Sequence, residues 1–312
     1  MRTFELTYPH SMMLNELPET VTAIGFFDGI HKGHQKVIQT AVKEAKDKGM
    51  ESAVITFYPH PTVVLKKDIQ HVKYLTPLRE KQEILQKLEV DRLYIIEFNH
   101  ELASLSPQEF VDHFLIGLHI KHMVAGFDFS YGHKGKGNME TIQEHADGAF
   151  TVTQVDKVLL NEEKISSTKV RSLMREGQMN KVTELLGRPL SVTGIVVKGD
   201  QRGRTIGYPT ANIAVSDKAL LPMIGVYAVK VLYKNEVYEG MASLGFKPTF
   251  TDQIEEPVLE VNIFDYNNDL YGEELRVEWH AFIREEKKFS GVEELVHEIA
   301  KDETEVRTYF NS

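Results

Sequence analysis

The feature that most constrains the fold of this chain is an alternation of strand-like and helix-like segments through its first half. A β-branched apolar run over Val21–Phe27 ends in the turn pair Asp28-Gly29, and a helical spacing of apolar residues follows over about residues 33–48. Later segments continue the rhythm, with expected strands at Ser52–Phe57, Arg92–Phe98 and His122–Ala125 and expected helices at Leu78–Leu88 and Pro107–Leu115. Such alternation predicts an α/β domain in which helices cover both faces of a parallel sheet.

The carboxyl ends of neighbouring parallel strands meet at one edge of a sheet, and α/β domains bind their ligands beyond that edge. The loops after Phe26, after Phe57 and after Gly126 each follow an expected strand. We therefore expect these three loops to converge on one binding site.

The rhythm changes near residue 187, where Gly187-Arg188-Pro189 ends a helical segment with a glycine and then a proline. A helix that ends in glycine and then proline is typical of a domain boundary. The segment therefore predicts domains over residues 1–186 and 187–312. The strand-like segments beyond it are short and closely spaced: Val192–Lys198, Ala211–Val215, Gly225–Tyr233, Glu236–Ser243, Val258–Phe264 and Leu275–Ile283. They predict an antiparallel β-barrel, anchored by Trp279 and followed by a terminal helix over about Val292–Phe310.

Composition limits the partners that the chain can have. Its 312 residues include 36 Lys and Arg against 46 Asp and Glu, a net charge of −10, and no cysteine. An acidic chain is a poor general nucleic-acid binder, because affinity for the phosphate backbone comes mostly from cations. Without cysteine there is no thiolate catalysis or disulfide, and the sequence shows neither a long apolar run nor a signal peptide. We expect a cytoplasmic enzyme with no nucleic-acid or membrane partner, and the sequence leaves its oligomeric state open.

The first candidate site lies in the segment Gly25–His34, between the first expected strand and the first expected helix. His31 and His34 are three residues apart, so at a helix start they share one face. The helix N-terminus offers partial positive charge and free N–H groups, and Gly33 lets a phosphate approach the backbone. A solvated histidine pair is the alternative, but the strand-turn-helix context favours a phosphate site in which both imidazoles donate hydrogen bonds.

A second cluster, Ile165–Arg171, lies where a strand ends and a helix begins. Ser167 and Thr168 are common helix-capping types, and capping explains them as well as ligand binding does. Lys169 and Arg171, however, oppose the dipole of the first helical turn, which favours an anion bound there.

In the second half, the segment Lys198–Asn212 contains three glycines and three cations. Such a loop can wrap phosphates with its backbone N–H groups, although a solvated hairpin is the commoner explanation of a Gly/Arg loop. Thr210 and Asn212 are two residues apart at its end, so their side chains point to one face of a strand. Two neutral oxygens side by side suit Mg²⁺.

Glu260 lies within the apolar strand Val258–Phe264, on the face opposite Leu259 and Val261. Its spacing alone favours a solvent-facing carboxylate. The alternative is a general base that accepts the proton of an attacking hydroxyl group.

Taken together, His31-Lys32-Gly33-His34 and Ser167-Thr168-Lys169-Val170-Arg171 resemble the nucleotidyltransferase superfamily. The strings Phe27-Asp28-Gly29, Pro59-His60-Pro61 and Gly126-Phe127-Asp128-Phe129 are similar to the FMN adenylyltransferase module of bacterial bifunctional riboflavin kinase/FAD synthetases. The resemblance implies a Rossmann-like domain with His31, His34 and Arg171 catalytic. It implies ATP contacts from Phe27, Asp28, Gly29, Gly33, Ser167 and Thr168, and flavin contacts from His60 and Asp128. The chain has Phe26 where the family usually has a polar residue.

Five strings of the second half resemble the flavokinase module of the same family: Arg202–Asn212, Gly225–Tyr227, Lys247–Phe250, Leu259–Val261 and Leu270–Gly272. The resemblance implies a six-stranded barrel with Glu260 as the catalytic base and Mg²⁺ held by Thr210 and Asn212. It also implies ATP contacts from Gly203, Arg204 and Thr205 and a flavin contact from Arg284. Ser243-Leu244 stands where the family usually has Asn-Ile.

By this resemblance the chain uses ATP and Mg²⁺ to phosphorylate riboflavin to FMN in the second domain and to adenylylate FMN to FAD in the first. One alternative is a single-activity FAD synthetase whose barrel binds flavin without turnover, which Ser243-Leu244 suggests. The other is a flavin-sensing regulator without turnover. Class I tRNA synthetases also contain His-x-Gly-His, but this chain has no Lys-Met-Ser-Lys-Ser string.

Overall fold

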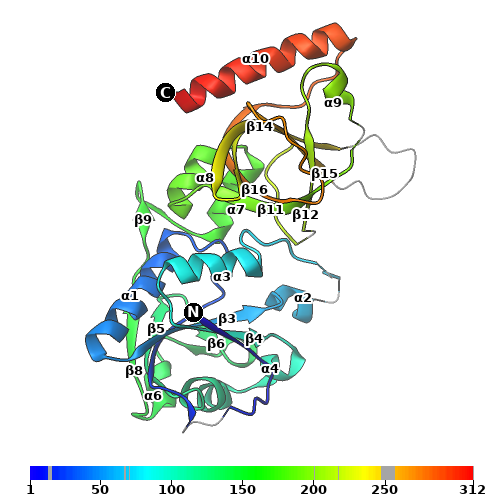
Figure 1. Cartoon of the computed structure of the whole chain (residues 1–312). Coiled ribbons are helices and arrows are strands. Elements are labelled where there is room, and N and C mark those ends of the chain that lie inside the picture. Colours follow the sequence, from blue (N-terminus) through cyan, green and yellow to red (C-terminus); the bar gives the residue numbers. More distant parts are fainter. Residues whose placement is uncertain are drawn as a thin grey trace. The chain divides into compact units, whose positions relative to one another are not determined.

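The structure is a computed structural model that describes residues 1–12, 16–66, 68–69, 71–199, 201–216, 218–246 and 257–311. The chain forms two compact units, Met1–Ser167 and Thr168–Ser312 (Figure 1). No helix among the described residues combines the length and the apolar content needed to cross a bilayer. The string Lys247–Phe250, singled out in the sequence, lies outside the described residues.

The first unit is built on a six-stranded parallel sheet with the strand order β1-β4-β3-β2-β5-β8 (Figure 1). Its strands are β1 (Arg2–Leu6), β2 (Thr20–Ile24), β3 (Glu51–Tyr58), β4 (Arg92–Glu97), β5 (Ile120–Gly126) and β8 (Thr151–Val155). β2 pairs with β3 on one side and with β5 on the other, so the chain reverses its progress across the sheet at β2. Open α/β sheets bind ligands at such a switch point.

Helices cover both faces of this sheet, which confirms the predicted α/β architecture. Apolar side chains of α1 (Lys32–Lys48) and α3 (Leu78–Lys87) form one core cluster with the sheet. The opposite cluster includes α4 (His100–Ser104), α5 (Pro107–Phe110), a π-helical segment (Val111–Ile116) and α6 (Ile142–Ala146). The smaller elements are α2 (Pro61–Leu65), a 3₁₀ turn (His133–Gly135), and the strand pairs β6 (Ser130–Tyr131) with β7 (Gly137–Asn138) and β9 (Leu159–Leu160) with β10 (Glu163–Lys164).

The first strand is shorter than the sequence predicts, because β2 ends at Ile24 and not at Phe27. Phe27 and Ile30 have φ values of 51° and 40°, which belong to the left-handed region and not to a strand. Both side chains are nevertheless buried in the core beside α1, which explains why the apolar run continues past the strand. Residues 25–31 thus form a turn, called the β2–α1 turn below.

The second unit is a closed six-stranded barrel with the order β11-β12-β15-β14-β13-β16. Its strands are β11 (Leu190–Val197), β12 (Ala211–Val215), β13 (Gly225–Tyr233), β14 (Glu236–Phe246), β15 (Pro257–Ile263) and β16 (Glu274–Arg284). Every neighbouring pair is antiparallel, as predicted. The predicted anchor Trp279 is fully buried and meets Tyr227 edge to face.

Among the described residues, the helices that accompany the barrel strands are α7 (Ser167–Arg175), α8 (Met179–Leu186), α9 (Arg202–Thr205) and the terminal helix α10 (Val292–Asn311). Gly187 ends α8 in the left-handed conformation that a helix-terminating glycine favours. α8 packs against β11 and β16, and the Met174 carbonyl of α7 accepts a hydrogen bond from the Met223 N–H before β13. The border between the compact units therefore lies at Ser167 and Thr168. The division at residue 187 therefore stays a prediction about where the two activities separate.

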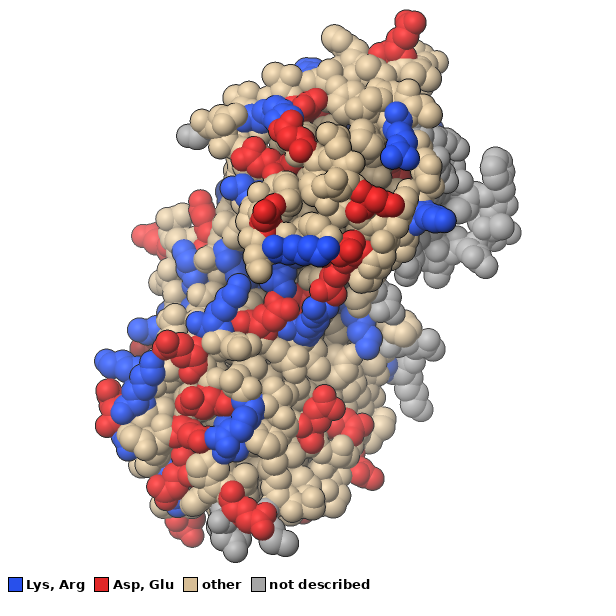
Figure 2. All heavy atoms as spheres, in the orientation of Figure 1, with Lys and Arg blue, Asp and Glu red and all other residues tan. Residues whose placement is uncertain are grey.

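The surface carries both signs of charge. On the face drawn in Figure 2, Lys and Arg side chains alternate with Asp and Glu across the described residues, without a large area of either sign. Any binding of a polyanion on this face therefore depends on a local arrangement of donors.

The single tryptophan gives the barrel an internal probe. We predict that Leu275→Ala, which empties a fully buried position of β16, lowers the free energy of unfolding of the second unit by about 2–5 kcal/mol. Urea unfolding followed by Trp279 fluorescence measures this change. Val237→Ala, at a side chain that is 58% exposed, is the matched control and should shift the midpoint little. Equal shifts in the two variants would contradict the placement of Leu275 in the core.

Candidate active sites

The start of α1 is built around two stacked imidazole rings. His31 precedes the helix, and its Nδ1 accepts a hydrogen bond from the backbone N–H of His34 at 3.2 Å. The two ring centroids are 3.6 Å apart, with 17° between the ring planes. A Cβ atom on Gly33 would lie 3.0 Å from the His31 ring, so the glycine makes room for the stack. This confirms that the two histidines share one face.

Burial keeps both histidines neutral. The pKa of His31 falls from 6.5 to about 4, mainly because burial penalises the imidazolium. Burial likewise holds the pKa of His34 well below its ordinary value, helped by the repulsion that an imidazolium charge on His31 would add and by the charge of Lys81. Because Nδ1 of neutral His31 is an acceptor, its proton resides on Nε2, which is then the donor of the ring. The pair therefore offers hydrogen bonds without bringing full positive charges.

Asp28 ties the β2–α1 turn to two other segments. Its carboxylate accepts a hydrogen bond from the Thr76 N–H at 3.1 Å, and its carbonyl accepts one from the Ser167 hydroxyl at 2.8 Å. Asp28 is 5% exposed, so its carboxylate has a structural partner in addition to its predicted contact with ATP. Gly29 follows with φ of 87°, a value that favours glycine at this point of the turn.

The loop after β3 reaches the same turn, as predicted. The ring of Phe26 lies edge to face against His60, with 4.5 Å between centroids, and also packs beside Tyr74. The Nδ1 atom of His60 accepts the N–H of Thr62 and so begins α2. Phe26, at a position where the family usually has a polar residue, thus contacts His60, which is expected to bind the flavin.

The loop after β5 also reaches the histidine pair. Asp128 pairs with Lys164 at 2.7 Å, and the Lys164 ammonium group lies 4.5 Å from the centre of the Phe127 ring. Both charges act on His31, because Asp128 raises its pKa and Lys164 lowers it. The three loops that follow β2, β3 and β5 therefore converge, which confirms the expectation drawn from the strand rhythm.

The remaining predicted residues of the first site have different surroundings. The Phe27 side chain is buried and meets His34 edge to face, which leaves only its main chain for a nucleotide contact. Thr168 and Arg171 lie on α7, in the second compact unit. Their expected roles toward ATP stay predictions.

The barrel brings two predicted residues of the second site into contact. The Thr210 hydroxyl donates a hydrogen bond to the Glu260 carboxylate at 3.2 Å. Asn212 pairs with Glu260 across β12 and β15, and Ser243 of β14 lies opposite Glu260 on its other side. Directly opposed residues of antiparallel strands project from the same face. Ser243, which stands where the family usually has Asn, is therefore a direct neighbour of Glu260, the expected base.

The Gly/Arg loop folds tightly against this face. A Cβ atom on Gly199 would lie 2.2 Å from the Asn212 amide, and one on Gly203 would lie 2.2 Å from the Tyr208 carbonyl. Gly203 therefore leaves no room for a side chain beside the backbone, and a side chain at Gly199 would displace the Asn212 amide. The loop contains the one-turn helix α9, which includes Gly203, Arg204 and Thr205.

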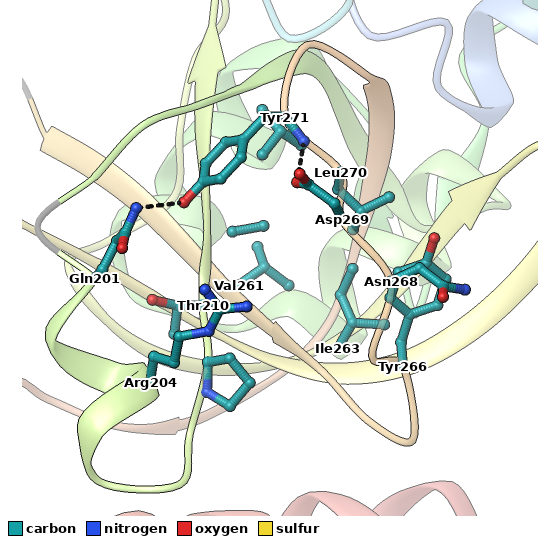
Figure 3. Close-up of a pocket in the computed structure, with 13 residues that line it drawn as sticks. Gln201, Arg204, Thr210, Val261, Ile263, Tyr266, Asn268, Asp269, Leu270 and Tyr271 are labelled. Carbon is teal, nitrogen blue, oxygen red and sulfur yellow. Dashed lines mark hydrogen bonds between the residues drawn. The ribbon is translucent and has the colours of Figure 1, made fainter.

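A cavity of about 180 Å³ opens beside the loop (Figure 3). Arg204 and Thr210 lie on one side of it and Tyr266 and Asn268 on another, while Tyr271 receives a hydrogen bond from Gln201 at 3.1 Å. Val196, Pro209, Ala211, Val261, Ile263, Asp269 and Leu270 complete its lining. The cavity thus joins an apolar wall to a cation and several neutral polar groups, which is the mixture that small-molecule sites present.

The oxygen donors beside this cavity fit Mg²⁺. A hydroxyl and a carboxylate in contact, with the Asn212 amide next to them, are hard ligands of the kind that this ion prefers. No cluster of three His, Cys, Asp or Glu side chains was found in the part of the chain that the structure describes. Mg²⁺ commonly takes only one or two protein ligands and completes its shell with phosphates and water.

Sequence reasoning missed several contributors to the two sites. Lys164 and Lys81 lie in segments with many charged residues, where nothing in the spacing distinguishes them. Tyr266 and Asn268 follow β15, and only the fold brings their loop to the Gly/Arg loop. Tyr271 of the same loop belongs to the string Leu270–Gly272 that the family resemblance includes. Arg284, expected to contact the flavin, is held by three hydrogen bonds of its guanidinium group to Asp302 of α10 at 2.7, 2.8 and 3.1 Å. Its role toward the flavin stays a prediction.

Comparison with known proteins matches each half of the chain to a protein family. The FAD synthetase family matches residues 14–169, and the riboflavin kinase family matches residues 186–310. A bifunctional riboflavin kinase/FMN adenylyltransferase of Bacillus subtilis is 44% identical over 100% of this chain and 99% of the relative. One of the same name from Listeria monocytogenes is 49% identical over 93% of this chain and 92% of the relative.

A solved structure matches nearly the whole chain. The crystal structure described as a macrolide-efflux protein from Streptococcus pneumoniae is 36% identical and has a TM-score of 0.89, with coverage of 98% of this chain and 99% of that chain. An adenylyltransferase-type α/β domain and a kinase-type barrel are thus combined in one chain. The protein belongs to the bifunctional riboflavin kinase/FMN adenylyltransferase family.

The low pKa of the histidine pair has a consequence for stability. Between about pH 4 and 6.5 the unfolded chain takes up protons that folded His31 does not, so stability falls as the pH falls through this window. We predict that NMR spectra show neutral His31 and His34 rings throughout pH 5–8. The same residues in urea, where burial is lost, provide the control and should titrate near the ordinary value. Titration of either folded ring near pH 6.5 would contradict the buried stack.

Proposed function

We propose that the two units perform successive steps of flavin cofactor synthesis, at the two sites described above. The family makes the chain a riboflavin kinase and an FMN adenylyltransferase. The observation that best supports the assignment of the first site is the neutral histidine pair stacked at the N-terminus of α1. The partial positive charge of that helix end and the Nε2 donor of His31 suit a triphosphate.

In the first unit, a phosphate oxygen of FMN attacks the α-phosphorus of ATP, the bond to the β-phosphate oxygen breaks, and pyrophosphate leaves. The attacking oxygen is already anionic, so this step requires no general base. His31, His34 and the helix N-terminus hold the triphosphate, and their preorganised hydrogen bonds stabilise the charge that shifts onto the leaving group. Ser167, Thr168 and Arg171 close on the same phosphates, and His60 and Asp128 contact the flavin.

In the barrel, the 5′-hydroxyl of riboflavin attacks the γ-phosphorus of ATP, and ADP leaves with the bridging oxygen. Glu260 accepts the proton of the hydroxyl as the new P–O bond forms. Its hydrogen bond with Thr210 supports this role, because it fixes the carboxylate beside the Gly/Arg loop. Gly203, Arg204 and Thr205 of that loop bind the phosphates of ATP.

Thr210 and Asn212 would hold Mg²⁺, which would supply charge neutralisation for the phosphates. A cytoplasmic location without a nucleic-acid or membrane partner is part of the proposal. It is supported by the net charge of −10 and by the lack of cysteine. We place the border between the two activities at residue 187. The match to the riboflavin kinase family, which begins at residue 186, supports this position.

We predict that the double variant His31→Ala/His34→Ala stops FAD formation from FMN but leaves FMN formation from riboflavin within about twofold of the parent. Chromatography of the flavin products, with riboflavin or FMN supplied separately, measures both. The control His100→Ala changes an exposed histidine and should alter neither rate.

Because His31 caps α1, its loss costs about 0.5–2 kcal/mol, so circular dichroism should accompany the assay. His31→Asn keeps a capping acceptor but removes the imidazole, and we expect it to lose FAD formation while remaining folded. Equal loss of the two activities in the folded double variant would refute the division of labour.

We predict that Glu260→Gln lowers the turnover of riboflavin phosphorylation by about 10²-fold or more, the scale of lost general-base catalysis. The amide keeps the size of the side chain but accepts no proton. Glu293→Gln, an exposed position on α10, is the charge-matched control. A turnover within about twofold of the parent would remove Glu260 from the mechanism.

A further inference from the structure

Lys81 of α3 is a buried cation that the two reactions described above do not use. Its side chain is 3% exposed, and burial lowers its pKa from 10.5 to about 8. Removing an ammonium group from water is costly, and an apolar residue at such a position often stabilises a protein more. A buried lysine beside a site of phosphate chemistry therefore calls for a role other than packing.

The ammonium group is directed at one backbone atom of the β2–α1 turn. It donates a hydrogen bond to the Phe26 carbonyl at 2.8 Å and another to the Thr56 hydroxyl at 3.1 Å. The Thr56 hydroxyl donates to the same carbonyl at 2.9 Å, and Lys81 Nζ lies 5.0 Å from the centre of the Phe26 ring. Lys81 thus joins α3, β3 and the turn at a single point.

This contact lies immediately before the strained part of the turn. Phe27 and Ile30 both have positive φ values, and such residues cost about 1–3 kcal/mol each unless their surroundings impose the conformation. Asp28 and His31 follow in the sequence, and the orientation of the Phe26 peptide group determines the direction of the backbone that leads to them. Two donors on one carbonyl are the kind of constraint that holds a strained turn.

The charge of Lys81 also acts on its neighbours across the site. Asp28, in the turn, favours the ammonium form of Lys81, and Lys81 in turn disfavours the protonated form of His34 on α1. β3 contributes the neutral Thr56 at this place. The buried cation therefore supports the neutral state of the histidine pair while it fixes the turn.

We propose that Lys81 is a positioning residue for adenylyl transfer: its ammonium group holds the Phe26 carbonyl and so fixes the turn that presents Asp28, His31 and His34 to the nucleotide. This inference rests on the proposed function of the first site. It assigns Lys81 no contact with substrate.

The test combines a variant with a pH profile of the full-length protein. We expect Lys81→Met to lower kcat for FAD formation from FMN by about 10- to 100-fold, the scale of a small misplacement of reacting groups. Riboflavin phosphorylation by the same sample should stay within about twofold of the parent. Lys43→Met, an exposed lysine on α1, is the matched control and should leave both activities unchanged.

The pH profile separates positioning by the charge from simple packing. In the parent, kcat for adenylyl transfer should fall as the pH rises through about 8, because Lys81 then loses its proton. Lys81→Met has no such proton to lose and should lack this alkaline limb. Lys81→Arg, which keeps the charge, should move the limb above pH 10 and recover part of the rate. If Lys81→Met is too unstable to assay, the pH profiles of the parent and of Lys81→Arg still test the inference.

Three results would overturn the inference. They are a kcat of Lys81→Met within twofold of the parent, a parent profile that is flat from pH 7 to 9.5, and a reduced rate in Lys81→Met that keeps the alkaline limb. The double histidine variant distinguishes the inference from its basis. If that variant loses FAD formation and Lys81→Met does not, only the role of Lys81 fails. If the double variant still forms FAD, the proposed first site fails as well.

Discussion

Two imidazole rings stacked 3.6 Å apart at the start of a helix cannot both be protonated at moderate cost, and the rest of the first site follows from that constraint. Burial keeps the rings neutral, so the positive potential that meets a triphosphate comes from the helix N-terminus and from oriented N–H donors. The orientation of these donors depends on the β2–α1 turn, in which Phe27 and Ile30 adopt unfavourable backbone angles. The carbonyl of Phe26 and the carboxylate of Asp28 hold that turn to β3, α3 and the segment before α3.

In the proposed function, the two units bind the same co-substrate by different physical means. An acidic chain with a net charge of −10 has no general attraction for polyanions, so each site must assemble donors locally. The first unit uses a helix end and neutral imidazoles. The barrel instead uses a glycine-rich loop that packs tightly against β12, with Arg204 facing a cavity and a hydroxyl–carboxylate contact between Thr210 and Glu260. A base belongs only in the barrel, because only there is the attacking group a neutral hydroxyl.

Much of this could be predicted from the sequence, because the decisive signals are local. Strand and helix periodicity gave the parallel sheet and the barrel, and the spacing of His31 and His34 indicated their shared face. The end of β2 was predicted too late, since buried Phe27 and Ile30 resemble strand residues although they belong to a turn. Lys81 and Lys164 could not be found, because their importance depends on partners that are distant in sequence, Phe26 and Asp128. Low pKa values likewise follow from burial, which spacing does not reveal.

The most direct measurement of the central claim is a crystal structure of the protein with a non-hydrolysable ATP analogue and Mg²⁺. We expect one polyphosphate at the N-terminus of α1, within hydrogen-bond distance of His31 and His34, and a second against the Gly/Arg loop beside Thr210 and Glu260. Polyphosphate density at neither place, with the nucleotide bound elsewhere on the two units, would contradict this expectation.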